Sequence, residues 1–462
     1  MKKRPNVILI TIDSLRADHC GFMGYEKNTT PNIDALAKES IVFTQAYSTA
    51  PMTAQSLISL LTSTYPLDYN GPRKIEKPRV LLSEVFKKEG YTTAVFTSNA
   101  YISNFFGYNR GWDFFEYLAP PFEIRKNRFQ EKFKKIFKKI SFNTFPQIFF
   151  WIKYLEYKKE RKKPDFNEEK FWKGIPDFLI IHTFKEFVEA MKKKEFFAWI
   201  HCMGVHAPYL PFNQLLKRSC LSLSDIEILS LPGHFAAFPN KKPLRELVTK
   251  NLQKIKDFYN QAIQYTDFWI GSLLNFLREK KLYQETLIVL TSDHGEEFLE
   301  HGETNHPCQL YNELLHVPLL IKIPEKPPQK ITKKVSLIDL APTLCEVLNI
   351  SPSSTFKGKS LFAPNSNPFL FHQTGFNEKK EGVFKYVEIE KITQCKVASQ
   401  FQNWKYILDH GNGQEELYNL SKDPKEQNNI ASKESKILVK MRKIVQEFEK
   451  QNPPLSLVNK SV

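Results

Sequence analysis

The chain has 462 residues, of which 42% are hydrophobic and 25% are charged. This composition excludes a disordered chain, and the length suffices for one large α/β domain with a smaller one. The formal charge of +16 indicates attraction to acidic partners. Charge alone does not choose between nucleic acid, anionic lipid and a phosphorylated or sulfated substrate.

Cysteine usage and apolar runs exclude further classes. No CxxC pair occurs, so neither a disulfide framework nor a zinc knuckle is indicated. No apolar run approaches the roughly 18 residues that span a bilayer. The first run, VILITI, begins six residues after the start and is interrupted by Asp13, which is unlike a signal peptide. We therefore expect a cytoplasmic protein with reduced thiols. Its six cysteines are Cys20, Cys202, Cys220, Cys308, Cys345 and Cys395.

Short apolar runs alternate with helical patterns along the chain. Such runs are typical of strands that are buried on both faces of a parallel sheet. We predict strands at 6–12, 92–98, 196–203, 286–292 and 317–323. Helical spacing is found at 30–40, 83–90, 183–194 and about 247–282, and again after Thr53. The alternation predicts an α/β sandwich with a mostly parallel central sheet between helices.

Two segments depart from this alternation. The region at about 120–176 is dense in Lys, Arg and aromatic residues, and RFQEKFKKIFKKI places its apolar residues on one helical face and its lysines on the other. Such a helix could lie on an anionic membrane surface or pack as a lid, and we favour the lid. No base-reading motif supports nucleic-acid binding, so none is expected.

Short polar strands and a closing helix follow residue 370. They predict a small C-terminal α+β subdomain at 371–462, after a catalytic domain at 1–370 that carries the basic aromatic insertion.

Polar residues follow several of the predicted strands. They are Asp13, Asn99, His206, Asp293 and His294. A lone Asp or Asn after a strand is more often a turn residue. Ligands of open parallel sheets, however, bind beyond the carboxyl ends of the strands, and independent turns have no reason to gather these residues at one edge. We expect them to form a site.

Asp13, Asp293 and His294 offer oxygen and nitrogen ligands for one divalent cation, without distinguishing Ca, Mn, Mg or Zn. Thr53 could complete this set. It has two interpretations: an N-cap of the helix that follows, or a nucleophile at a helix N-terminus, where an anion binds well. A cation would lower the pKa of its hydroxyl and neutralise charge on a transferring group.

With these residues in this order, the sequence resembles the sulfatase family of the alkaline phosphatase superfamily. The resemblance rests on NVILITIDSLRADHCGFMGYEKNTTPNIDALAKES, TAQSLISLLTSTYP, GVHAPYLPF, TSDHGEEFLEHGETNHPCQLYNELLHVPLLIK and EELYNLSKDPKEQNNI, which follow the family's order. It implies an alkaline-phosphatase-like sandwich with a smaller C-terminal sheet.

The resemblance also implies roles. Asp13, Asp293 and His294 match metal ligands, His206 matches the substrate-contacting histidine of the HxPY block, and His306 lies where the family often places a histidine near the leaving group. A second metal near His206 and His306 stays open. For two further histidines, His301 and His316, we favour a structural role.

The departures from the family bear on the chemistry. Formylglycine sulfatases carry C-x-P-S-R, and the aligned residues 53–57 read TAQSL, which keep only Ser56. Ser14 replaces a second aspartate, and Asn99 occupies the neighbourhood of a missing lysine. Threonine in this position resembles the superfamily's phosphodiesterases, phosphoglycerol transferases and phosphoethanolamine transferases.

We therefore expect a metal-dependent hydrolase or transferase that cleaves an anionic ester. Thr53 would attack, Asn99 would steady the non-bridging oxygens, and His206 or His306 would protonate the leaving group. A phosphate ester is favoured over a sulfate ester, because phosphothreonine can be resolved by in-line water attack. The alternatives are a sulfuric ester hydrolase, and a catalytically silent protein that binds a polyanion or lipid headgroup.

Overall fold

The computed structural model describes residues 4–69, 71, 74–118, 176–191, 195–209, 223–237, 242–363, 368–376 and 394–453. Apart from Pro176, the basic aromatic segment predicted at 120–176 lies outside these ranges, and so does most of the polar segment between 371 and 394. A lid or membrane-binding helix in that segment therefore stays a prediction. Within the described ranges, no helix is both long and apolar enough to cross a membrane.

The core of the described chain is an eight-stranded sheet with the order β10-β2-β9-β6-β1-β5-β3-β4. β9 runs antiparallel to both of its neighbours, and every other pair is parallel. The prediction of a mostly parallel central sheet is confirmed. The strands are β1 (Asn6–Ile12), β2 (Ile41–Tyr47), β3 (Thr92–Thr97), β4 (Phe114–Tyr117), β5 (Phe196–Cys202), β6 (Thr286–Ser292), β9 (His316–Lys322) and β10 (Gln329–Ser336).

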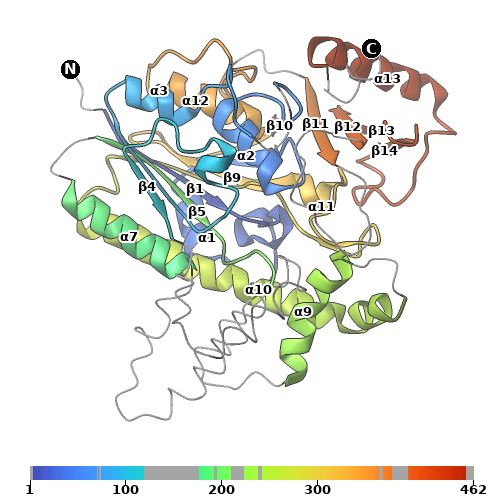
Figure 1. Ribbon diagram of the computed structural model, residues 1–462, viewed down its shortest axis with the longest axis horizontal. Coiled ribbons are helices and arrows are strands. Elements are labelled where there is room, and N and C mark those ends of the chain that lie inside the picture. The colour runs from blue at the N-terminus through green and yellow to red at the C-terminus, as the bar shows by residue number, and fades with distance from the viewer. Residues whose placement is uncertain are drawn as a thin grey trace.

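Helices cover both faces of this sheet (Figure 1). Along β1, Ile8 and Ile10 pack on one side and Val7 and Leu9 on the other, because successive side chains of a strand point to opposite faces. One face packs against α1 (Pro31–Ala37), α7 (Pro176–Ala190) and α10 (Lys242–Glu279), with α9 (Leu223–Ala237) beside α10. The other face packs against α2 (Thr53–Thr62), α3 (Leu82–Lys88) and α12 (Leu340–Val347).

Short elements lie in the connections. They are η1 (Ala17–His19), η2 (Gly21–Met23), η3 (Asn104–Phe106), β7 (Glu297–Phe298), β8 (Thr304–Asn305), α11 (Asn312–Leu315) and η5 (Leu337–Asp339).

A separate four-stranded antiparallel sheet follows near the C-terminus. It consists of β11 (Phe369–Phe376), β12 (Gln394–Phe401), β13 (Trp404–Asp409) and β14 (Glu415–Asn419). One face packs on α13 (Ser435–Gln451). The opposite face buries Leu370 and Ile407 against Tyr47, Leu310 and Leu315 of the larger part. The sheet is therefore joined to the segment that connects β8 to β9.

Candidate active site

The carboxyl ends of four adjacent parallel strands place the predicted residues at one edge of the sheet. β6, β1, β5 and β3 are neighbours and run in the same direction. Asp13 follows β1, Asn99 follows β3, and Asp293 and His294 follow β6, while His206 lies four residues beyond β5. The parallel arrangement thus gathers residues that are nearly 300 positions apart in sequence.

Asp13, Asp293 and His294 form a compact buried cluster, which we call the metal cradle. All three are fully buried, and one ligand atom of each lies within 4.8 Å of the others. His294 Nδ1 donates to the Gly295 carbonyl at 2.8 Å, so the lone pair of its Nε2 is available to the cradle. This Nε2 lies 3.6 Å from Asp293 Oδ2 and 3.8 Å from Asp13 Oδ1.

The electrostatics of the metal cradle suit a divalent cation. Asp293 Oδ2 is buried and accepts no hydrogen bond from any described residue. Burial, and then the charge of Asp13, raise the pKa of Asp293 well above its ordinary value. Burial and the neighbouring charge of His306 lower the pKa of His294 to about 4, which favours the neutral imidazole that binds metals. Two buried carboxylates and a neutral imidazole therefore fit a cation, which would neutralise the carboxylates.

Ser14 occupies the position of the second aspartate that the resemblance implied. Its N–H donates to Asp293 Oδ1 at 3.3 Å, and its Oγ donates to Asp13 Oδ1 at 2.9 Å. Its φ of 61° lies in the left-handed region, which a serine seldom adopts. Ser14 thus holds both carboxylates by hydrogen bonds and adds no third negative charge.

Thr53 is the first residue of α2, and its hydroxyl contacts the metal cradle. Thr53 Oγ1 lies 3.2 Å from Asp13 Oδ2 and 3.0 Å from His294 Nε2. The N-cap of α2 is Met52, which forms no side-chain cap. The N-cap interpretation of Thr53 is therefore wrong, because the N-cap position is held by the preceding residue, Met52. The Thr53 hydroxyl contacts Asp13 and His294 instead of an amide of its own helix.

Asn99 lies against the same carboxylate. Its Nδ2 donates to Asp13 Oδ2 at 3.1 Å, while its Oδ1 accepts the N–H of Tyr101 at 2.9 Å. Sequence reasoning missed its neighbour His201, whose Nε2 lies 3.3 Å from Asn99 Nδ2 and 3.5 Å from Asp13 Oδ2. The sequence feature that could have identified His201 is its position inside the apolar run FFAWIHCM, where both faces of the strand are buried and a histidine needs a polar partner.

His206 and His306 meet at the side of the metal cradle. Their ring centroids are 5.2 Å apart, and the ring of His306 lies 4.6 Å from that of His294. His206 Nδ1 donates to the Ala207 carbonyl at 2.6 Å. His306 Nδ1 lies 3.4 Å from Oε1 of Glu296, a fully buried residue whose burial raises its pKa to about 7. Glu296 was also missed, although it is the acidic residue of the DHGE block.

His301 and His316, for which the sequence favoured a structural role, make contacts away from the metal cradle. His301 stacks on Tyr311 with ring centroids 3.5 Å apart and bonds to Glu313 Oε1 and to the carbonyl of Glu426. His316 Nε2 donates to the backbone carbonyl of Thr44. These contacts agree with the structural role that we favoured.

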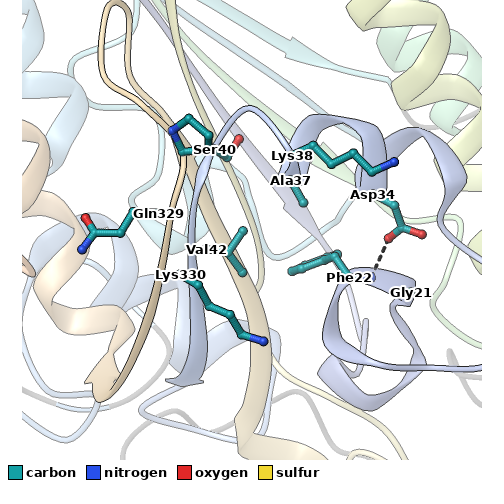
Figure 2. A pocket seen from close by; sticks show the side chains of 10 residues that line it. Gly21, Phe22, Asp34, Ala37, Lys38, Ser40, Val42, Gln329 and Lys330 are labelled. Atoms are coloured by element: carbon teal, nitrogen blue, oxygen red, sulfur yellow. Dashed lines mark hydrogen bonds between the residues drawn. The ribbon is translucent and has the colours of Figure 1, made fainter.

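A cavity of 570 Å³ lies away from this edge, between α1 and the edge strand β10 (Figure 2). Lys38 and Lys330 contribute to its lining, and the Asp34 carboxylate there accepts the N–H of Phe22 at 2.8 Å. None of the predicted site residues lines it. We assign no ligand to it.

The chain is similar in sequence to known sulfatases. The chain is 26% identical over 377 residues to an ulvan-active sulfatase of Formosa agariphila, with 79% of this chain and 66% of that protein covered. It is 30% identical over 187 residues to arylsulfatase K of Bos taurus, with 40% of this chain and 34% of that protein covered. The matched stretches therefore span less than two thirds of either relative.

The fold is similar to that of a phosphonate monoester hydrolase of Agrobacterium radiobacter. The TM-score is 0.71 at 17% sequence identity, with 98% of this chain and 97% of that chain covered. A family model described as N-sulphoglucosamine sulphohydrolase, C-terminal, matches residues 300–452. The model described as sulfatase matches residues 5–350, which is well over half of the chain. The protein therefore belongs to the sulfatase family.

Proposed function

We propose that the protein is a metal-dependent ester hydrolase in which Thr53 is the nucleophile and the natural substrate is a phosphate ester. The observation that carries this proposal is the position of Thr53 Oγ1, at 3.2 Å from Asp13 Oδ2 and 3.0 Å from His294 Nε2. A hydroxyl that lies beside two proposed ligands of the cation, at the first turn of a ten-residue helix, is well placed to attack an anionic centre.

The surrounding side chains have complementary roles. A divalent cation held by Asp13, Asp293 and His294 would lower the pKa of the attacking hydroxyl and neutralise charge on the transferring group. The Thr53 hydroxyl gives up its proton and its oxygen bonds to phosphorus, while the bond from phosphorus to the leaving oxygen breaks and that oxygen takes a proton from His206 or His306. Water then cleaves the phosphothreonine and restores the hydroxyl.

The choice of phosphate rests on the residue that replaces cysteine. A formylglycine hydrate can expel sulfate by breaking its own C–O bond, whereas a threonine sulfate would have to be cleaved at sulfur. A phosphothreonine is resolved by in-line attack of water at phosphorus. Residues 53–57 read TAQSL, so the threonine chemistry favours the phosphate ester.

A substrate panel tests the proposal. The purified protein would be assayed with Mn²⁺, Mg²⁺, Ca²⁺ or Zn²⁺ on p-nitrophenyl phosphate, bis-p-nitrophenyl phosphate, p-nitrophenyl phenylphosphonate and p-nitrophenyl sulfate. Thr53→Val keeps the shape of the side chain and removes the hydroxyl, and we expect it to lower kcat by at least about 10³-fold. Thr53→Ser keeps a nucleophile and should retain most of the activity.

Thr62→Val is the matched control. Thr62 is a buried threonine at the other end of the same helix, and its hydroxyl donates to the Ile58 carbonyl at 2.7 Å. Its kcat should stay near that of wild type. Unchanged turnover in Thr53→Val would reject the nucleophile. Faster turnover of the sulfate than of any phosphorus ester would favour a sulfuric ester hydrolase. Metal binding without turnover of any ester would favour the catalytically silent protein.

A further inference from the structure

The turn at Met203–His206, which follows β5, is held by a carboxylate of α7. Asp177, in the first turn of α7, is fully buried. Its Oδ1 accepts the N–H of Met203 at 2.8 Å and the N–H of Gly204 at 3.1 Å. The turn itself closes through the N–H of His206, which donates to the Met203 carbonyl at 3.1 Å. One side chain thus fixes two consecutive amides of the Met203–His206 turn.

Thr266 of α10 holds the second oxygen of this carboxylate. Its hydroxyl donates to Asp177 Oδ2 at 2.7 Å. The fit around Gly204 is close, because a Cβ at this position would lie 2.4 Å from both Asp177 Oδ2 and Thr266 Oγ1. The turn therefore rests directly on the Asp177–Thr266 pair, with no space for a side chain between them.

The Met203–His206 turn touches the candidate active site at two points. Met203 Sδ accepts a hydrogen bond from Asn99 Nδ2 at 3.2 Å. The His206 ring, at the other end of the turn, lies 5.2 Å from that of His306. A shift of the turn would therefore move His206 and remove a contact of Asn99.

Within the described residues, the hydrogen bonds that the Asp177 side chain accepts lie outside its own helix. An acidic residue in the first turn of a helix usually interacts with the free amides of that helix. Asp177 instead accepts hydrogen bonds from the amides of Met203 and Gly204, in the turn that follows β5, and from the hydroxyl of Thr266 in α10. Burying a carboxylate is costly unless its oxygens are bonded. The contacts that offset this cost are those that hold the Met203–His206 turn.

We propose that Asp177 is a positioning residue which, with Thr266, fixes the Met203–His206 turn and so directs His206 toward the leaving-group oxygen of the ester. This inference rests on the proposed function, because His206 contacts substrate only if the protein hydrolyses an ester. Asp177 itself touches no reacting atom.

Leaving-group dependence tests this role. A p-nitrophenolate leaves without a proton, whereas phenolate benefits from one, so a misplaced His206 should affect phenyl phosphate more. We expect Asp177→Ala to lower kcat/KM by about 100-fold on phenyl phosphate, the scale of a 1 Å misplacement, and by less than about threefold on p-nitrophenyl phosphate. In the His206→Ala background, Asp177→Ala should cause no further loss on phenyl phosphate.

Conservative and matched variants separate positioning from general destabilisation. Asp177→Asn keeps an oxygen for the two amides and should restore kcat/KM to within about threefold. Asp267→Ala is the control, since Asp267 is also buried and also accepts two amides, those of Asn32 and Ile33, but at α1. Asp267→Ala should lower the stability of the protein and leave unchanged the ratio of kcat/KM on phenyl phosphate to kcat/KM on p-nitrophenyl phosphate.

Crystal structures of Asp177→Ala and Asp267→Ala provide a readout that does not depend on turnover. A displaced His206 ring is expected in the first variant only. An unmoved ring, an additional loss in the His206→Ala background, or equal losses on both leaving groups would overturn the positioning role. If the wild-type protein hydrolysed no ester, the proposed function would fail, and so would the role of His206 at a leaving group. The two crystal structures would still decide whether Asp177 holds the turn.

Discussion

His201 Nε2 lies 3.5 Å from Asp13 Oδ2, and both side chains are fully buried. Trp199 Nε1 donates to Thr11 Oγ1 at 2.9 Å, and Thr11 Oγ1 lies 2.7 Å from His201 Nδ1. In the tautomer that carries its ring proton on Nε2, His201 accepts from Thr11 at Nδ1 and directs an N–H toward Asp13. A chain of three side chains thus orients one carboxylate of the metal cradle.

Replacement of His201 should weaken metal binding. Loss of a partner that orients a metal ligand typically costs about 10- to 100-fold in affinity. We expect that range for Mn²⁺ in His201→Leu, measured by titration calorimetry, and a smaller loss in His201→Gln, whose amide can still donate to Asp13. His182→Gln, at a half-exposed histidine of α7, is the control. Equal Mn²⁺ affinity in wild type and His201→Leu would contradict the assignment.

Metal binding should stabilise the protein through the metal cradle. A ligand at 100 times its Kd stabilises the folded state by about 2.7 kcal/mol. Thermal unfolding in EDTA and in excess Mn²⁺ should therefore differ in Tm by several degrees. Asp293→Asn removes one of two adjacent buried charges, so it should reduce this difference and leave the metal-free Tm no lower than that of wild type. A metal-induced shift that is unchanged in Asp293→Asn would show that the cation binds elsewhere.

The sequence predicted the strands that helices cover on both faces of the sheet. β1, β5 and β6 are buried at every residue and read as continuous apolar runs. β10 was missed because it is an edge strand, and QKITKKVS exposes Gln329, Lys330 and Thr332 to solvent. β2 was missed because Thr44 and Gln45 interrupt its apolar run. Whether a strand has a continuous apolar pattern in the sequence therefore depends on its position in the sheet, which is a tertiary property.

The same reasoning applies to the site. Asp13, Asp293 and His294 were predictable because they follow buried strands, and the order of parallel strands brings such residues to one edge. His201 lies inside a strand, where a histidine is usually a satisfied core residue. Its contact with Asp13 depends on the pairing of β5 with β1, which no local pattern encodes.

His301 should make stability depend on pH. Burial alone would lower its pKa, but the hydrogen bond and charge of Glu313 and the Glu426 carbonyl raise the pKa of His301 to about 9. The folded value exceeds the unfolded value of about 6.5. The stabilisation is therefore fully present below pH 6.5 and is lost as the pH rises through 9. At about 1.4 kcal/mol for each pKa unit, it amounts to at most about 3.5 kcal/mol.

Urea unfolding at pH 6, 7, 8 and 9 measures this contribution. The free energy of unfolding of wild type should fall relative to that of His301→Gln across this range, since glutamine does not titrate. The difference between the two proteins isolates His301 from nearby carboxyl groups such as Glu297, whose pKa is raised by burial to about 7. Parallel curves for the two proteins would exclude the charged form of His301.

The C-terminal sheet should depend on one buried ion pair. Lys405 Nζ of β13 lies 2.6 Å from Glu426 Oε1, and both side chains are fully buried. The second carboxylate oxygen of Glu426 accepts the N–H of Asn312 at 2.7 Å, so the pair also joins the sheet to α11. Removing one member leaves a buried charge unpaired, which costs about 3–5 kcal/mol, whereas removing both charges costs less.

We therefore expect Lys405→Met to lower the free energy of unfolding by about 3–5 kcal/mol, and Lys405→Met with Glu426→Gln to recover part of that loss. The control is Lys396→Met, which removes the more exposed Lys396–Asp409 pair of the same sheet, at 3.6 Å, and should cost less than about 1 kcal/mol. Chemical denaturation of wild type, these three variants and the single variant Glu426→Gln gives the comparison. If the double variant were as unstable as the sum of its single variants, the two charges would not be coupled. Coupling of several kcal/mol would instead show that the Lys405–Glu426 pair contributes, beside the apolar contacts of Leu370 and Ile407, to holding the C-terminal sheet against the segment between β8 and β9.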